Sequence, residues 1–312
     1  MDVKEALSIV KGEDAAERTE QAAAIKDRYR SKVASACSIY NAKSGSCPEN
    51  CKFCAQSAHY GSNCDSYPFV GKEKILAAAK RAVDIGASRF SIITSGYGIS
   101  SQKEMDEICQ CVEYVKSWGD IRVCASLGVM SKEQLEQLRN AGLDRYHHNL
   151  EASRSYYGEV CTTRSYEENY DTAKYAKEVG LEICCGGIFG MGESMLQRAE
   201  LVCEIASLEP SGVPCNFLCP IPNTPLGHLE MITTNEGLAV IRALRIALPE
   251  SEIFVCGGRE GVFKDRQDEI FANGADGFMT GDYLTTKGDP VEKDKLMLRR
   301  LGFRLESELE QA

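Results

Sequence analysis

The sequence has few of the features that direct a chain into a membrane, into secretion or onto nucleic acid. No apolar run approaches the roughly 18 residues that a membrane-spanning helix needs. The first residues lack a basic start followed by an apolar core, so they do not predict a secretory signal. With 36 Lys and Arg against 46 Asp and Glu, the net charge is -10, which argues against nucleic acid or an anionic membrane as a partner. We therefore expect a cytoplasmic protein.

Low-complexity segments and linkers rich in proline and serine are also missing. Instead, β-branched runs alternate with helix-like segments along the 312 residues, a length that suits two average domains or one large barrel. The β-branched runs predict eight strands, at residues 36–42, 89–94, 121–126, 145–149, 181–188, 213–218, 253–256 and 277–279.

Helix signals separate these strands. Ser131 with Gln134 forms a capping box, and Ser165 begins another. Strands that alternate with helices predict a parallel sheet, because parallel strands need crossover connections. We expect an α/β fold: a (β/α)8 TIM-type barrel over residues 36–312, preceded by an N-terminal helical extension over residues 1–35. An open doubly wound sheet is the alternative, since periodicity does not reveal closure.

Cysteine is abundant, with 15 residues. In a reducing compartment this favours metal binding or redox chemistry over disulfides. Cys47, Cys51 and Cys54 follow the first strand at spacings of four and three, without a second C-x2-C arm. They are either half of a zinc site completed elsewhere, or three corners of an iron–sulfur cluster with one iron left open. Isolated cysteines in helical patterns, such as Cys109 and Cys203, are expected to be core residues.

The C-x3-C-x2-C spacing, with Phe53 before the last cysteine, resembles the radical S-adenosylmethionine superfamily. The resemblance implies that the three cysteines hold a [4Fe–4S] cluster. It also implies that the amino and carboxylate groups of S-adenosylmethionine bind the fourth iron. This interpretation is favoured over zinc.

Three further motifs suit a nucleoside cofactor. "GGIFGMGE" fits the superfamily's G-x-I-x-G-x-x-E pattern, in which glycines such as Gly187 let the backbone approach adenine and Ile188 offers an apolar face. Glu193 ends this motif, and the dinucleotide pattern G-x-G-x-x-G is absent. In "YHHNLEAS", Asn149 and Glu151 lie two residues apart, so both point the same way and suit the ribose hydroxyls.

The other polar residues near these motifs have ordinary explanations as well. Arg164, in "TTRSY", is a candidate clamp for the carboxylate of S-adenosylmethionine, although alone it reads as a surface arginine. His147 and His148 are adjacent on a predicted strand, so they should face opposite sides and not share a metal.

Motifs over most of the chain, from about residue 36 to 301, resemble the biotin synthase family within this superfamily. They are "CPENCKFCAQS", "AGLDRYHHNLE", "YGEVCTTRSYEE", "GGIFGMGES", "NTPL" and "GGREG". The resemblance implies that a 5'-deoxyadenosyl radical removes hydrogen from dethiobiotin and that an auxiliary iron–sulfur cluster donates sulfur. It further implies that Asn149 and Asn216 contact dethiobiotin. A homodimer and an electron donor such as flavodoxin or ferredoxin are also implied.

One position departs from the family. Its members are expected to hold a [2Fe–2S] cluster with three cysteines and one arginine, and the resemblance assigns Cys124, Cys184 and Arg259 to this set. Ser91 stands where the remaining cysteine is expected, and serine is a poor ligand for iron. Either the auxiliary cluster is lost, or Cys37 on the neighbouring first strand replaces the missing ligand.

We favour an auxiliary cluster held by Cys37, Cys124 and Cys184, either of the [2Fe–2S] type or of a four-iron type, with Arg259 nearby or as a ligand. Cys256 is a further candidate ligand. Two other functions stay open. One is a radical enzyme of the same fold with a mutase or hydrogenase-maturation reaction. The other is a non-enzymatic iron–sulfur scaffold or electron carrier, which the nucleoside motifs argue against.

Overall fold

The computed structural model describes residues 1–285 and 288–310. Its strands are β1 (Val33–Lys43), β2 (Arg89–Thr94), β3 (Arg122–Ser126), β4 (Arg145–His147), β5 (Glu182–Cys184), β6 (Gly187–Phe189), β7 (Gly212–Phe217), β8 (Glu252–Val255), β9 (Gly277–Met279) and β10 (Arg304–Leu305). Its helices are α1 (Val3–Val10), α2 (Ala15–Tyr29), α3 (Lys72–Asp84), α4 (Gln102–Trp118), α5 (Lys132–Asn140), α6 (Tyr157–Val160), α7 (Tyr166–Glu178), α8 (Met195–Ser207), α9 (Thr234–Ala247), α10 (Arg259–Phe263), α11 (Glu269–Ala272), α12 (Val291–Leu301) and α13 (Glu306–Glu310), with a 3-10 turn at Lys264–Arg266.

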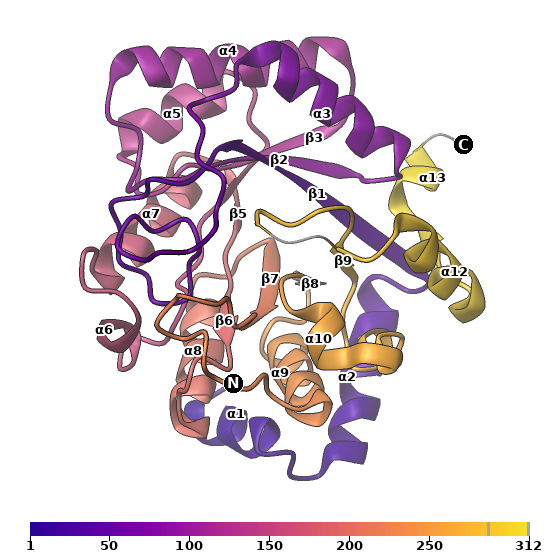
Figure 1. Ribbon diagram of the computed structural model, residues 1–312. Coiled ribbons are helices and arrows are strands. Elements are labelled where there is room, and N and C mark those ends of the chain that lie inside the picture. Colours follow the sequence, from indigo (N-terminus) through magenta and orange to yellow (C-terminus); the bar gives the residue numbers. More distant parts are fainter. Residues whose placement is uncertain (286–287, 311–312) are drawn as a thin grey trace.

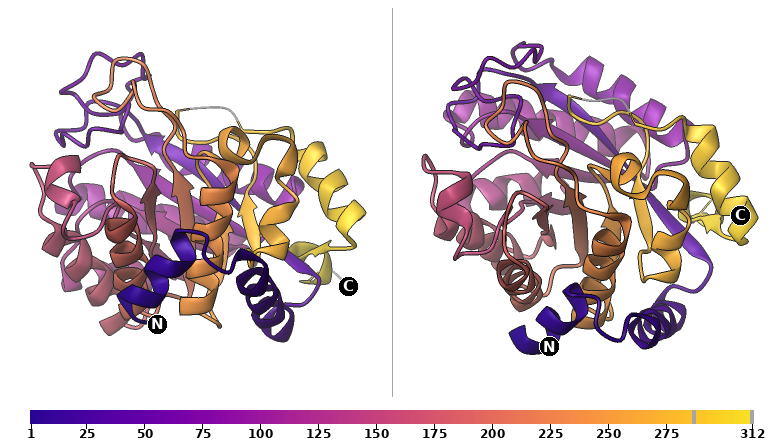
Figure 2. Two further views of the ribbon diagram at one scale, coloured as in Figure 1. Left: turned by 90° about the horizontal axis from the view of Figure 1, so that it is seen from below. Right: turned by 60° about the horizontal axis from the view of Figure 1, so that its bottom comes forward.

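The strands form a closed parallel barrel, which confirms the predicted (β/α)8 fold. The hydrogen-bonded order runs β1-β2-β3-β4-β5-β7-β8-β9 and returns to β1. Closure comes from β1 and β9, where Ser35 pairs with Gly277 and Cys37 with Met279. Helices surround the barrel in Figure 1. The first two helices lie outside this ring, with α1 against α8 and α9, and α2 against α9 and α11 (Figure 2).

The fifth strand differs from the prediction because it is interrupted. β5 pairs with β7 at Cys184 and Gly212, and pairing resumes with β6 at Gly187 and Cys215. A Cβ at Gly186, between the two pieces, would collide with the carbonyl oxygen of Pro214. The glycine lets the chain pass close to β7 at this bend, and the residues that follow it turn toward the open end of the barrel.

The helix caps agree with the sequence signals. Both capping boxes form, at Ser131 with Gln134 and at Ser165 with Glu168, so two orphan amides of each helix start are satisfied. In the part of the chain that the structure describes, no helix has the length and apolar character needed to cross a membrane.

The barrel interior contains a small apolar cluster of its own. Phe254, Cys256 and Met279 are buried together, and Cys37 and Ile39 of β1 pack against them. This cluster is separate from the main core between the strands and the surrounding helices. Inward-facing cysteines are therefore part of the packing at the centre of the barrel.

Candidate active site

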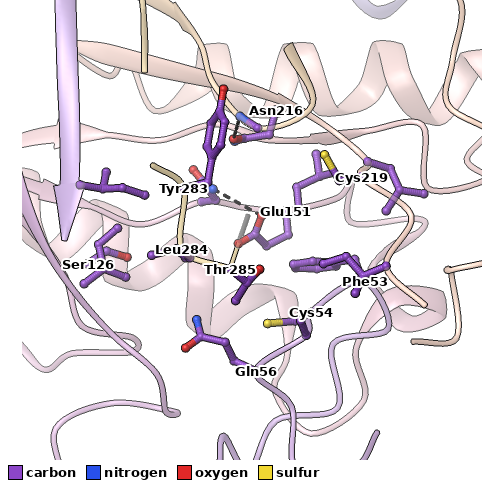
Figure 3. A pocket seen from close by; sticks show the side chains of 18 of the residues that line it. Phe53, Cys54, Gln56, Ser126, Glu151, Asn216, Cys219, Tyr283, Leu284 and Thr285 are labelled. Carbon is purple, nitrogen blue, oxygen red and sulfur yellow. Dashed lines mark hydrogen bonds between the residues drawn. The ribbon is translucent and has the colours of Figure 1, made fainter. Parts of the chain in front are cut away.

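A cavity of about 1080 Å³, counted to its open mouth, lies at the C-terminal ends of the strands. Phe53 and Cys54 line it from the loop after β1, and Asn149 and Glu151 line it from the segment after β4. Asn216 contributes from β7 (Figure 3). The topology of parallel strands brings these residues together, as expected for the functional face of a barrel. We call this space the upper cavity.

The three clustered cysteines lie on the loop that follows β1, over residues 44–67. Within the loop, Cys47 N donates to Gln56 O at 3.0 Å and accepts from Ala58 N through its carbonyl at 2.8 Å. Asn50 ties the loop to the segment before α7, because its Oδ1 accepts from Thr162 N at 2.9 Å. Among the described residues, no three His, Cys, Asp or Glu side chains already converge as a finished metal site.

The side chains of Cys51 and Cys54 have different surroundings. Cys54 reaches into the upper cavity, where Figure 3 shows its sulfur facing the open space. The thiol of Cys51 is hydrogen-bonded to Cys161, and this bond together with burial raises the pKa of Cys51. Burial also raises the pKa of Cys54 to about 11. Both thiols are therefore protonated near neutral pH, and metal loading must displace those protons. The sequence assigned no role to Cys161.

Asn149 and Glu151 form a connected pair. Asn149 Oδ1 accepts from Gly186 N at 3.1 Å, and its Nδ2 donates to Glu151 Oε2 at 3.4 Å. Glu151 has a left-handed backbone, with φ of 66°, which is unusual for a residue with a side chain. Burial raises the pKa of Glu151 to about 7, against the opposing effect of the positive charge on Arg164. The site therefore holds a carboxyl group that titrates near physiological pH.

The two histidines face opposite sides, as alternation predicts. His147 lines the upper cavity and lies 3.1 Å from Asn149 Oδ1 through its Nε2. Burial lowers the pKa of His147 to about 4, so its ring is neutral. His148 points outward, with its Nε2 3.0 Å from Oδ1 of Asn169 on α7. The sequence did not indicate that His147 reaches the cavity.

The glycine-rich motif contributes one side chain to the cavity, that of Ile188. Gly187 lies beside the backbone of Glu151, and a Cβ there would come within 2.8 Å of Leu201 Cδ2. Glu193 does not line the cavity. Its carboxylate accepts from Gly190 N at 2.8 Å, Met191 N at 2.7 Å and Arg198 Nε at 2.9 Å. These bonds give Glu193 a role in holding the turn.

Arg164 and Asn216 are also held by neighbours. Arg164 Nε donates to the Tyr157 hydroxyl at 3.3 Å, and the arginine does not line the upper cavity. Asn216 lines the cavity while its Oδ1 accepts from Gly257 N at 3.0 Å. The amide of Asn216 is thus oriented by backbone, and Arg164 acts on the cavity through its charge near Glu151.

A second, much smaller cavity of about 30 Å³ lies below the first, inside the barrel. We call it the thiol cavity because four thiols from different parts of the barrel line it: Cys37, Cys124, Cys184 and Cys256. The hydroxyl of Ser91 also lines it and has no hydrogen-bond partner within the described chain. The thiol and upper cavities share three lining residues, which form a wall between them: Ile39, His147 and Met279.

Arg259 lies near the thiol cavity, close enough for its charge to act on Cys256, but it is engaged by another residue. It is not among the residues that line the thiol cavity, and its guanidinium pairs with Asp294 of α12 through bonds of 2.8 and 3.1 Å. The arginines that do line the cavity are Arg89 and Arg145, which the sequence did not single out. Both arginines stand at the start of a predicted strand. An arginine in a buried strand needs a charged or polar partner, so each of them could have been recognised as a candidate for a functional or paired position.

Two family models match the chain. The Radical SAM superfamily matches residues 43–202, and the Biotin and Thiamin Synthesis associated domain matches residues 214–304. A biotin synthase of Geobacter metallireducens is 46% identical over 296 residues, covering 95% of this chain and 90% of the relative. A biotin synthase of Brachyspira hyodysenteriae is 41% identical over 282 residues, covering 90% and 84%.

The chain belongs to the biotin synthase family.

Solved structures of more distant proteins share the fold of this biotin synthase family member. Methylornithine synthase has a TM-score of 0.84 at 16% identity, covering 99% of this chain and 96% of that one. The FeFe-hydrogenase maturase of Carboxydothermus hydrogenoformans has a TM-score of 0.82 at 17% identity, covering 98% and 76%. At these identities the likeness concerns the barrel alone.

The donor sets of this family member suit the family's cofactors, which are a [4Fe–4S] cluster with S-adenosylmethionine and an auxiliary iron–sulfur cluster. The cysteine loop supplies three thiols, and Cys54 opens onto the upper cavity, where a non-protein ligand has room. Among the residues that the structure describes, the thiol cavity presents soft sulfur donors and no carboxylate, a set that selects iron–sulfur or zinc over hard cations.

The role of Glu193 in the turn can be tested through stability. In Glu193→Gln, one oxygen is replaced by an NH2 group that faces donors, and buried Arg198 loses a charged partner. We expect the free energy of unfolding to fall by about 1.5–3 kcal/mol, as for hydrogen bonds to charged groups. Urea denaturation of the cluster-free protein measures it, with Glu230→Gln at an exposed site as control. An unchanged midpoint would contradict this role.

Proposed function

We propose that this chain is a biotin synthase, a radical S-adenosylmethionine sulfurtransferase that inserts sulfur into dethiobiotin. The observation that carries the proposal is the stacking of two cavities. A nucleoside-sized space bordered by the cysteine loop lies directly above a cavity lined by four thiols, with a wall of three side chains between them. Sulfur insertion into an unactivated carbon needs a radical source and a sulfur source at such close range.

Each cofactor has a proposed set of residues. Cys47, Cys51 and Cys54 would hold the [4Fe–4S] cluster, leaving one iron for S-adenosylmethionine. When bound, the clusters supply the electron that cleaves S-adenosylmethionine into methionine and a 5'-deoxyadenosyl radical, and the sulfur for the product. Asn149 and Glu151 accept and donate hydrogen bonds at the ribose, since both line the upper cavity and are already oriented.

Other residues position these groups or the substrate. Ile188 offers an apolar face to adenine, while Gly187 and Glu193 shape the turn that presents it. Arg164 contributes positive charge beside Glu151. Asn216, with Asn149, would bind the polar end of dethiobiotin. The apolar lining keeps the radical away from water, which limits side reactions.

Several further expectations stay proposals. We propose one barrel domain over residues 36–312 with a helical extension over 1–35, and a homodimer. Flavodoxin or ferredoxin is the proposed electron donor, and neither nucleic acid nor a membrane is a proposed partner. Fifteen free cysteines suit a reducing compartment, which supports the proposed cytoplasmic location.

Product formation tests the function directly. We expect reduced, cluster-loaded protein to convert dethiobiotin to biotin when incubated anaerobically with S-adenosylmethionine and reductant, with biotin measured by mass spectrometry. Omission of S-adenosylmethionine is the control and should abolish the product. Formation of 5'-deoxyadenosine without biotin would favour a mutase or hydrogenase-maturation type of reaction. No cleavage of S-adenosylmethionine at all would favour an electron carrier.

The carboxyl group of Glu151 predicts a pH dependence of cofactor binding. Its pKa is raised to about 7 in the free protein, so the charged form that best accepts ribose hydroxyls is lost as pH falls through 7. Binding of S-adenosylmethionine should weaken over the same range. Glu151→Gln should bind roughly tenfold more weakly at pH 8 and lose this dependence.

Anaerobic titration calorimetry between pH 6 and 8 measures both effects on the cluster-loaded protein. Glu159→Gln, at an exposed position on α6, is the matched control and should behave as the parent. If Glu151→Gln keeps both the affinity and the pH profile, Glu151 does not contact the ribose.

We propose that Cys37, Cys124 and Cys184 hold the auxiliary cluster. All three thiols line the thiol cavity, and Cys37 is on the strand beside Ser91. Cys256 faces the same cavity and can serve as a fourth ligand. Four available thiols suit a four-iron cluster as well as a [2Fe–2S] cluster. Arg259 stays nearby, engaged by Asp294.

Removing Cys37 tests this ligand set. Cys37→Ala should lose the iron and sulfide of the auxiliary cluster, and its Mössbauer components, while the [4Fe–4S] cluster of the loop stays. Cys215→Ala is the matched control, since Cys215 is buried on β7 but does not line the thiol cavity. An unchanged second cluster in Cys37→Ala would exclude Cys37 as a ligand.

A further inference from the structure

Two arginines lie beside the thiols of the thiol cavity. In the strand register, Cys37 of β1 pairs with Arg89 of β2, and Cys124 of β3 pairs with Arg145 of β4. Both arginines line the cavity and are 2–3% exposed. Among the described residues, no carboxylate lines it. Toward the N-terminal ends of the strands, the cavity is therefore bordered by two guanidinium groups whose carboxylate partners do not line it.

Most N–H groups of Arg145 already donate hydrogen bonds to carboxylates that do not line the thiol cavity. Its Nε and Nη2 donate to Glu182 Oε2, at 2.9 and 2.6 Å, and Nη2 also donates to Glu252 Oε2 at 3.1 Å. Its Nη1 is buried and has no hydrogen-bond partner among the described residues. A buried N–H without a partner is rare, because it loses its bonds to water and gains none.

Gly212 shows where this free donor lies. A Cβ built on Gly212 would be 2.8 Å from Arg145 Nη1 and 3.4 Å from Cys184 Sγ. The donor and the sulfur therefore both border the space above this glycine of β7. The absence of a side chain there leaves the approach of the guanidinium to Cys184 open.

Resting on the proposed function, we propose that Arg145 is a positioning residue of the auxiliary cluster, whose Nη1 donates a hydrogen bond to sulfur at Cys184. Glu182 and Glu252 hold the guanidinium in place, so the donor faces the sulfur. Hydrogen bonds to cluster sulfur and a nearby positive charge stabilise the reduced, more negative state. Arg145 thereby raises the reduction potential of the auxiliary cluster and helps to retain it.

Two variants remove this contact in different ways. Arg145→Lys keeps a positive charge but loses the planar fork, so it cannot hold both carboxylates and reach the sulfur. Gly212→Ala keeps Arg145 and both carboxylates but places a methyl group that Nη1 must avoid, while Cys184 Sγ stays at ordinary contact distance. The glycine variant therefore separates the hydrogen bond from the ion pairs.

The readout is a redox titration of the cluster-loaded protein, followed by Mössbauer and EPR spectroscopy. In both variants we expect the auxiliary cluster to be harder to reduce, by about tenfold in the equilibrium constant, or about 59 mV for one electron. The potential of the [4Fe–4S] cluster of the loop should not change and serves as internal reference. Biotin formation by the parent protein is measured in a separate assay. Failure of the proposed function can therefore be distinguished from failure of the proposal for Arg145.

Matched controls address charge and backbone. Arg122→Gln removes an arginine of β3 that is exposed and does not line the thiol cavity. Gly158→Ala adds a methyl group where nothing lies within 4 Å. Both should leave the potential unchanged. If Gly212→Ala keeps the reduction potential and the iron content of the parent, the proposal is overturned. A lower potential or iron content in Arg145→Lys alone would then be explained by its broken ion pairs. Loss of auxiliary iron from a folded Gly212→Ala supports it.

Discussion

One buried carboxylate organises the lower end of this barrel. Glu252, at the start of β8, is 1% exposed and accepts hydrogen bonds from Arg89 at 2.9 Å and from Arg145 at 3.1 Å. It also forms an ion pair with Arg30 at 3.1 Å. Buried charges of one sign are tolerated only when partners neutralise them. Glu252 therefore allows two arginines to stand inside a barrel next to thiols. Without it, Arg89 would keep only Glu306 and Arg145 only Glu182, both of which are more exposed than Glu252.

This arrangement divides the barrel interior into layers of different chemistry. Charged pairs lie lowest, thiols lie above them, and the polar amides and carboxyl of the upper cavity lie at the open end. Ile39, His147 and Met279 separate the last two layers. Since burial lowers the pKa of His147, the wall carries no charge at neutral pH. A neutral, partly apolar wall separates the upper cavity from the thiol cavity, but it is only one layer of side chains thick.

The sequence predicted most of the strands and the capping boxes because these follow from local periodicity and cap chemistry. The barrel was favoured because eight strands alternate with helices, although periodicity alone does not reveal closure. Alternation placed Asn149 and Glu151 on one face, whereas Asn216 was assigned to the site only by the family resemblance. The sequence could not place Glu193, whose bonds to Gly190 and Met191 depend on a turn formed in the folded chain. Nor could it show that Arg259 pairs with Asp294, because that partner lies 35 residues further along the chain.

If Cys37 replaces the ligand that is missing at Ser91, the replacement thiol lies at a different level of the barrel. Ser91 pairs in register with Ile39 on β1, whereas Cys37 pairs with Arg89 and, on the other side, with Met279. Cys37 is therefore two residues closer to the start of the strands than the position opposite Ser91. Cys256 also contacts Met279 in this layer. Cys37 is thus shifted toward Arg89, whereas Cys124 lies in register with Ser91. A thiolate at Cys37 would therefore lie beside the guanidinium of Arg89, and a nearby positive charge favours the thiolate form.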